Sequence, residues 1–163
     1  VLEDLRRFQW DFATFKVDWA LDGPVPWRAE QAARAGTVHL ADGVDELTRF
    51  AAQIAMRQVP DRPFALFGQM TTADPVRSPK GTESAWAYTH VPLDVASDAG
   101  DEGLTGGWGP AEQEIMADRV ERQVERFAPG FRSLIRARRV LAPPALEALD
   151  ANLHHGAING GTT

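Results

Sequence analysis

Residues 13–21 have the sequence ATFKVDWAL. Every second position of this segment carries a large apolar side chain: Phe15, Val17, Trp19 and Leu21. Because successive side chains of a strand point to opposite faces, the alternation predicts a strand with one apolar face. The strand should end at Asp22-Gly23-Pro24, since Gly permits positive φ and Pro lacks a backbone donor.

Four further segments have strand character. They are residues 37–41, 63–70, 83–91 and 136–141. The mostly apolar run at 63–70 is typical of an inner strand. In the 83–91 segment, Trp86, Tyr88 and His90 alternate with smaller residues and should share one face. The turn residues between these two segments predict a hairpin with a long loop.

Residues 42–58 have the spacing of an amphipathic helix. Asp42 is a suitable cap, and Asp45 and Glu46 favour the positive end of the helix dipole. Its predicted buried face consists of Leu47, Phe50, Ala51, Ile54 and Ala55.

Residues 110–128 predict the longest helix, which Pro110 opens and Pro129-Gly130 ends. Its predicted buried stripe consists of Met116, Val120, Val124 and Phe127. Arginines crowd the last third of the chain, at positions 119, 122, 126, 132, 136, 138 and 139. We interpret them as a solvated helix face and an edge strand rather than as a binding patch.

Together these segments predict an α+β fold. About five mostly antiparallel or mixed strands should form a sheet, with the helices at 42–58 and 110–128 packed on one face. Residues 1–163 should be a single domain. The glycine-rich residues 96–109 predict a mobile surface loop, and residues 151–163 a Gly-rich tail.

The composition excludes several classes of protein. The 163 residues have 44% hydrophobic and 25% charged side chains, which argues against global disorder. A net charge of −6 makes a general nucleic-acid role unlikely. Of the 17 basic residues only Lys16 and Lys80 are lysines, a bias that a GC-rich bacterial genome would produce.

The absence of cysteine excludes disulfides and thiolate chemistry. No apolar run approaches the length of a membrane span, which is ~20 residues. The start at Val1 is no signal peptide and has no initiator Met, so we expect a chain that is processed or cut from something larger. We expect a cytoplasmic location, with peripheral membrane contact as an alternative, and leave a homodimer open.

Three searches for reactive groups give no catalytic residue. The four His residues, His39, His90, His154 and His155, lack metal-binding spacing, so no metal is expected. Residues 103–109, GLTGGWG, lack the ending of a phosphate-binding loop. No G-x-S-x-G motif occurs.

Aromatic side chains are the more informative signal. If one sheet face lines a pocket, it would suit an apolar or flat ligand. The candidate substrate-binding residues are therefore Trp19, Trp86, Tyr88 and His90. For His90 the simpler interpretation is a hydrogen-bonded residue at a sheet edge.

Four motifs, in order, resemble one enzyme family. The first is residues 15–27, FKVDWALDGPVPW. The second is Asp74-Pro75 with Pro79 and Gly81, before a strand that ends in His90-Val91-Pro92. The third is Ala142-Pro143 with Leu146-Glu147, where the family has T-P-x-x-L-E. The last is Asn152-Leu153 with Gly156 and residues 158–162, INGGT, which is similar to N-L-x-G-G-x-I-N-G-G-T.

These motifs resemble the phytoene desaturase (carotenoid desaturase)-type FAD-dependent oxidoreductases. The resemblance implies an enzyme that removes or adds hydrogen on apolar, often polyene, substrates. It also implies an FAD-binding domain with a G-x-G-x-x-G motif, which is absent from this sequence. We therefore expect the substrate-binding region of a larger flavoenzyme, with FAD in the intact protein, no FAD bound to this chain, and no redox activity of the chain alone.

Two alternatives remain open. One is a stand-alone module that binds a small apolar ligand without a flavin. The other is an interaction or assembly domain with no catalysis. A cavity that binds apolar ligand would favour the first, and a large symmetric interface would favour the second.

Overall fold

A computed structural model describes residues 2–162 and has the α+β fold that the sequence predicted. Five antiparallel strands form its sheet, in the order β3-β5-β6-β2-β8. These strands are β2 (Ala13–Leu21), β3 (Thr37–Leu40), β5 (Ala65–Gln69), β6 (Glu83–Val91) and β8 (Ile135–Leu141). All five predicted strands are confirmed, and the run at 63–70 is an inner strand as expected.

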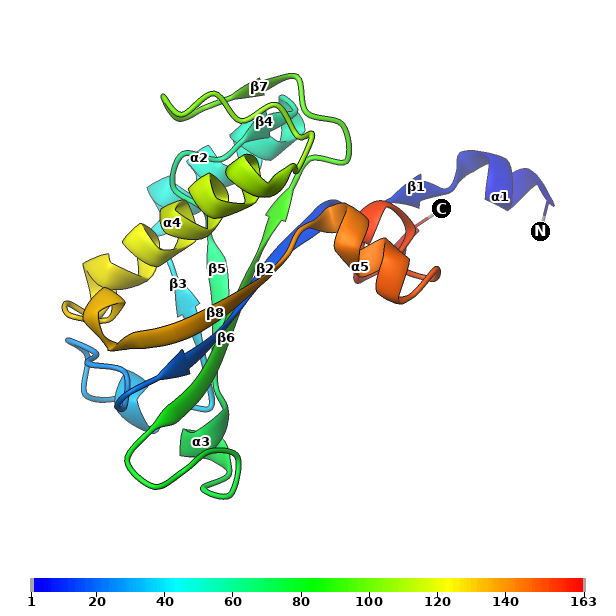
Figure 1. The fold of residues 1–163 in the computed structure, drawn as a ribbon. Helices are drawn as coiled ribbons and strands as arrows, with labels where there is room; N and C mark the ends of the chain where they lie inside the picture. The colour runs from blue at the N-terminus through cyan, green and yellow to red at the C-terminus, as the bar shows by residue number, and fades with distance from the viewer. Residues whose placement is uncertain (1, 163) are drawn as a thin grey trace.

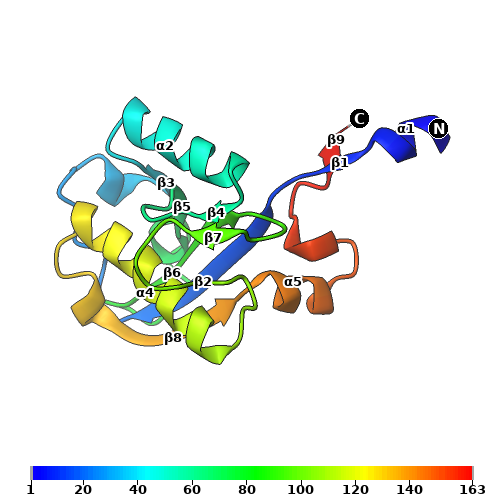
Figure 2. The ribbon, with the colours of Figure 1, turned by 90° about the horizontal axis from the view of Figure 1, so that it is seen from above.

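Two helices cover one face of this sheet and leave the other face without a helix over its centre (Figures 1 and 2). They are α2 (Val44–Ala55) and α4 (Pro110–Phe127). The core lies between them and the sheet, where the alternate side chains Phe15, Val17 and Leu21 are buried. In α4, Met116, Val120 and Val124 of the predicted stripe are buried and Phe127 is partly buried against the core, which confirms the helical spacing.

The buried face of α2 differs from the prediction. Ile54 is buried, but Leu47 is 39% exposed, and Ala51 and Ala55 are also exposed. Two polar side chains take the inner positions instead. Glu46 accepts a hydrogen bond from Arg126 of α4 (2.6 Å), and Gln53 donates one to Asp61 (2.7 Å). With these polar groups at inner positions, part of the apolar stripe of α2 faces outward.

The start of α2 also differs from the prediction. Gly43, not Asp42, is the N-cap residue, and it makes no side-chain cap bond. The backbone N–H of Asp42 instead donates to the Glu46 carboxylate (2.6 Å). Because Asp42 precedes the N-cap, this bond differs from a capping box, in which the N-cap N–H itself is the donor.

Arg119 does not lie on a solvated helix face, as the sequence analysis expected. It is 2% exposed and donates to both carboxylate oxygens of Asp98 (2.7 and 2.8 Å) and to the Pro60 carbonyl (2.9 Å). Its Nε also donates to Glu102 (2.8 Å). Three partners, two of them carboxylates, explain how a charged side chain is held in the interior.

The glycine-rich segment 96–109 contains a short strand and two buried side chains. The strand β7 (Ser97–Asp98) pairs in parallel with β4 (Gln58–Val59). Leu104 and Trp108 belong to the core. Asp98 accepts the backbone N–H groups of Gly100 and Leu104, which holds the loop in one conformation here. Its mobility in solution stays a prediction.

The ends of the chain meet away from the sheet. The strand β1 (Gln9–Trp10) pairs antiparallel with β9 (Gly161–Thr162), and Figure 2 shows this ribbon projecting beside α1 (Leu2–Arg7). The remaining elements are short: α3 (Met70–Ala73), α5 (Pro143–Leu149), and the 3-10 turns η1 (Ala32–Arg34), η2 (Arg132–Leu134) and η3 (His154–Gly156). Among residues 2–162, no helix has both the length and the apolar character needed to cross a membrane.

Candidate functional site

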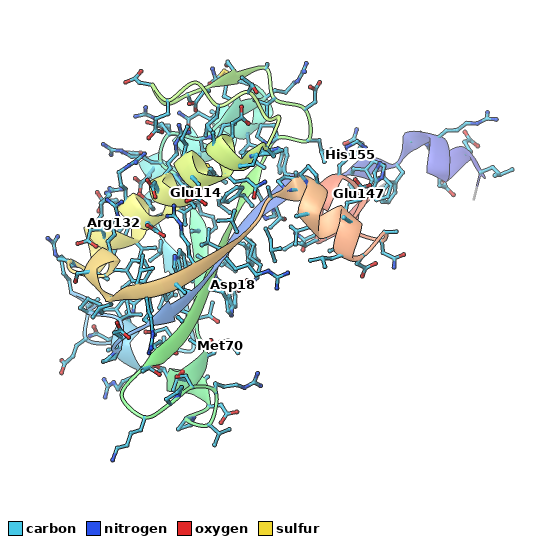
Figure 3. All side chains as sticks on the ribbon, in the orientation of Figure 1. Asp18, Met70, Glu114, Arg132, Glu147 and His155 are labelled. Carbon is cyan, nitrogen blue, oxygen red and sulfur yellow. The ribbon has the colours of Figure 1, made fainter. Side chains whose placement is uncertain are left out.

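The face of the sheet that α2 and α4 leave uncovered is the candidate site, and we call it the open face. Lys16 and Asp18 of β2 point to it, as does Leu66 of β5. Strand register aligns Lys16, Tyr88 and Leu66 in one cross-strand row. Figure 3 shows the two sides of the sheet, with Asp18 on the open face and Glu114 on the helix-covered side.

Trp86 lies across the neighbouring strand instead of standing away from the sheet. A Cβ atom at Gly68 of β5 would overlap Cε2, Cζ2 and Nε1 of its indole ring. Gly68 therefore makes room for the ring, as glycine in a strand often does where another group approaches closely. The indole N–H donates to Met70 Sδ (3.0 Å), which fixes the orientation of the ring.

Tyr88 continues this arrangement along β6. Its ring is nearly parallel to that of Trp86, with an interplanar angle of 9° and centroids 5.9 Å apart. His90 follows at 5.9 Å from Tyr88, with its ring edge-on. We call Trp86 and Tyr88 the aromatic platform. Two parallel rings on an uncovered sheet face can stack against a flat or elongated apolar ligand.

Charged groups lie beside the platform. Lys16 and Asp18 form an ion pair, so their charges largely compensate one another. Arg139 of β8 lies opposite Asp18 in the strand register and is exposed. The open face is therefore aromatic at its centre and polar along its β2–β8 side.

The structure brings together three of the four predicted site residues and separates the fourth. Trp86, Tyr88 and His90 share the open face, whereas Trp19 is 3% exposed in the core. The indole N–H of Trp19 donates to Glu121 of α4 (2.9 Å). Its ring packs against Phe131 at 5.2 Å. A ligand on the platform would not contact Trp19.

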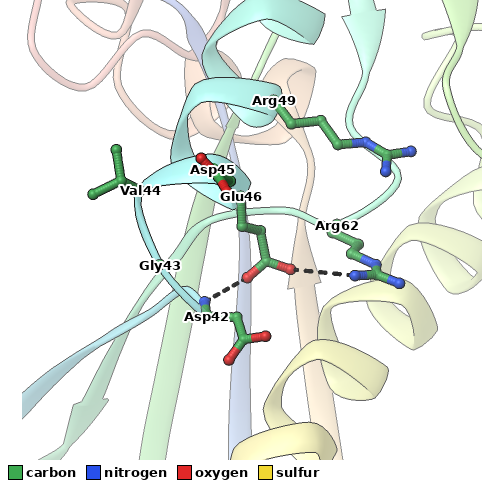
Figure 4. Close-up of a pocket in the computed structure, with 7 residues that line it drawn as sticks. All are labelled: Asp42, Gly43, Val44, Asp45, Glu46, Arg49 and Arg62. Atoms are coloured by element: carbon green, nitrogen blue, oxygen red, sulfur yellow. Dashed lines mark hydrogen bonds and ion pairs between the residues drawn. The ribbon is translucent and has the colours of Figure 1, made fainter.

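A polar hollow of about 420 Å³ lies away from the open face, at the start of α2 (Figure 4). Charged side chains of both signs line it: the acidic Asp42, Asp45 and Glu46, and the basic Arg49 and Arg62. Burial alone would raise the pKa of Glu46, but hydrogen bonds from the Asp42 backbone and from Arg126 lower it below its ordinary value. Glu46 is therefore ionised at neutral pH. The two arginines of the hollow are already paired, Arg49 with Asp61 and Arg62 with Glu46, so the hollow offers no unpaired cation to an anionic ligand.

A second hollow, of about 570 Å³, lies at the β3 edge. Trp27, Val38 and Phe127 contribute its apolar wall. The Trp27 indole N–H donates to Gln69 (2.8 Å), which fixes the orientation of this ring. Within residues 2–162 no group of three or more His, Asp or Glu side chains is placed to hold a metal ion.

Sequence reasoning missed Gly68 and Met70, which set the orientation of the platform. The isolated glycine in the apolar run at 65–69 was the available signal, because such a glycine often marks a close approach. Nothing in the sequence indicated that Met70 would accept the indole N–H.

Comparison with known proteins gives one partial similarity. No protein-family model matches the chain. The chain is similar to a mouse (Mus musculus) protein named Pyridine nucleotide-disulfide oxidoreductase domain-containing protein 2, with 31% identity over 96 residues. The match covers 55% of this chain and 15% of the mouse protein, so the chain spans a small part of that relative's length.

Proposed function

We propose that this chain is the substrate-binding part of a larger FAD-dependent oxidoreductase. The open face carries the proposal: it presents two parallel aromatic rings, Trp86 and Tyr88, without a covering helix. The partial similarity to a mouse protein named for an oxidoreductase domain supports the reaction class. The motif resemblance to the phytoene desaturase type supports an apolar, elongated substrate, and a polyene fits the platform by stacking along it.

This chain's own residues do not fit the flavin dinucleotide. A pyrophosphate is usually held by backbone N–H groups at a helix N-terminus that follows a strand. Of the two longer helices that closely follow strands here, α2 starts among the carboxylates of Asp42, Asp45 and Glu46. The arginines of the same hollow, Arg49 and Arg62, are paired with Asp61 and Glu46 and so are not free for a phosphate. The other, α5, starts with Pro143 and Pro144, which have no N–H to donate. The flavin is therefore assigned to another part of the intact protein.

Titration of FAD into the purified chain tests that assignment. We expect a colourless protein and no stoichiometric micromolar binding when flavin fluorescence is followed. Stacking on the platform contributes only ~0.5–1.5 kcal/mol beyond burial, which does not offset the several kcal/mol of freedom lost on association. Stoichiometric micromolar binding would contradict the proposal and favour a stand-alone flavoprotein.

An apolar aromatic probe tests the platform itself. We expect ethylnaphthalene to perturb the NMR signals of Trp86 and Tyr88, and Trp86→Ala to weaken its binding by about tenfold through loss of a stacked ring. Gly68→Ala should also weaken binding, because its Cβ displaces the indole. Gly109→Ala is the matched control, since a Cβ there meets no atom within 4 Å. Equal dissociation constants for wild type and Trp86→Ala would exclude the platform as the binding surface.

A further inference from the structure

Two unpartnered polar atoms lie at one end of the open face. Thr14 of β2 and His90 of β6 are directly opposite in the strand register, and Thr14 shares its face with Lys16 and Asp18. Thr14 is 0% exposed. Within residues 2–162, neither Thr14 Oγ1 nor His90 Nδ1 has a hydrogen-bond partner, although both atoms are buried.

These two atoms can satisfy each other. Directly opposite residues of an antiparallel pair have Cβ atoms about 4.5–5.5 Å apart, which brings a hydroxyl within reach of an imidazole. The Thr hydroxyl hydrogen rotates freely and serves as a donor. A buried polar group without a partner is costly, so a small side-chain adjustment that joins Oγ1 to Nδ1 is favourable.

The direction of this bond fixes the tautomer of the ring. Nδ1 can accept from Thr14 only when it carries no proton, which places the imidazole proton on Nε2. His90 Nε2 is not among the buried unpartnered atoms, and no described side chain or backbone group bonds to it. His90 is only partly buried, and its Nε2 is accessible to solvent.

We propose that Thr14 positions His90 so that its Nε2–H donates a hydrogen bond to a carbonyl oxygen of a ligand stacked on the aromatic platform. This inference rests on the proposed function and specifies its substrate class. The ligand has a flat apolar body against Trp86 and Tyr88, and a carbonyl group at the His90 end, one ring spacing (5.9 Å) from Tyr88. A pure hydrocarbon would cover the donor and leave it without a partner.

The ¹⁵N chemical shifts of the imidazole test the role of Thr14 without any ligand. In the neutral ring we expect the wild-type chain to show a protonated Nε2 and an unprotonated Nδ1 at His90. Thr14→Val keeps the shape but removes the hydroxyl, and should give a mixture of tautomers. Thr14→Ser, which keeps the hydroxyl, should retain the wild-type signature. An Nδ1–H ring in wild type, or unchanged shifts in Thr14→Val, would overturn the proposal.

Matched probes test the donor. Acetylnaphthalene and ethylnaphthalene have similar shapes, but only the first has a carbonyl oxygen. We expect wild type to prefer the ketone by roughly two- to tenfold, the range of one net hydrogen bond, and His90→Phe to lose this preference. No preference in wild type, or an equal preference in His90→Phe, would overturn the proposal.

Two further measurements separate the possible outcomes. Trp86→Ala should weaken both naphthalene probes equally. If it weakens neither, the proposed function fails; if it weakens both while the ketone preference is absent, only the present inference fails. Lumiflavin, whose ring carries carbonyl oxygens without phosphates, is the third probe. A His90-dependent binding of lumiflavin stronger than that of acetylnaphthalene would assign the carbonyl to the cofactor rather than to the substrate.

Discussion

The Val120→Asp variant is expected to be unfolded. Val120 is 1% exposed and lies between Met116 and Val124 on the face of α4 that packs against the sheet. A carboxylate there would be buried without a partner, which costs on the order of 4–5 kcal/mol. Domains of this size are stable by only ~5–15 kcal/mol, so this cost unfolds a domain at the lower end of that range and strongly lowers the denaturation midpoint of a more stable one.

Arg122→Asp is the matched control on the same helix. Arg122 is exposed, and its ion pair is with Glu102, itself partly exposed. Its substitution should change the free energy of unfolding by about 1 kcal/mol or less. Urea denaturation of the two variants measures both effects. Equal midpoints would show that the assignment of the buried face of α4 is wrong.

Arg119→Met is expected to destabilise the protein by about 3–5 kcal/mol, the usual cost of removing one partner from a buried ion pair. Asp98 would then remain with a side chain that is 4% exposed and no cation beside it. Arg122→Met, also on α4, should have a small effect. The double variant Arg119→Met with Asp98→Asn should recover part of the loss, because it removes the unpaired charge.

The pH at which the protein unfolds in acid is an independent test of the role of Arg119. Burial alone would raise the pKa of Asp98, but hydrogen bonds from Arg119, Gly100 and Leu104 lower it below its ordinary value of 3.8. Because the pKa of Asp98 is lower in the folded chain than in the unfolded chain, its ionised carboxylate stabilises the fold at pH values above the unfolded-state pKa. This contribution is lost as the pH falls through the folded-state pKa. Without Arg119 the pKa rises, so the variant should unfold at a higher pH than wild type. Identical acid midpoints would contradict the role of Arg119.

Local patterns were sufficient to predict the sheet and the longest helix. In residues 13–21 and 83–91, one set of alternate side chains is buried and the other lies on the uncovered face, so the sequence alternation matches the burial pattern of both strands. The stripe of α4 packs directly on the sheet, and its spacing is therefore visible in the sequence. The α2 prediction failed because Glu46 and Gln53 bond to Arg126 and Asp61, which both lie outside the helix, and Arg126 is 80 residues away.

The candidate site was predictable only in part, because alternation does not relate one strand to the next. It placed Trp19 on one face of β2, and Trp86 and Tyr88 on one face of β6. Only the register, in which Trp19 faces Ala85, shows that these are opposite faces of the sheet. The flat orientation of Trp86 depends on Gly68 in a third strand, and such a contact has no local signature.

The short ribbon formed by β1 and β9 determines how the molecule would respond to mechanical tension. The ribbon has two residue pairs, Gln9 with Thr162 and Trp10 with Gly161. A force that pulls the two ends of the chain apart would act on the first pair before the second. When two antiparallel strands are pulled apart from the same end, their hydrogen-bonded pairs break one after another. The force needed at each step is therefore only that which breaks a single pair. After the Asp11–Gly160 backbone bond, the next ladder pair that joins the two pulled segments to each other is Lys16 with Leu141, between β2 and β8. Tension would therefore open the sheet first beside Lys16, at the border of the open face, while α2 and α4 still cover the other side.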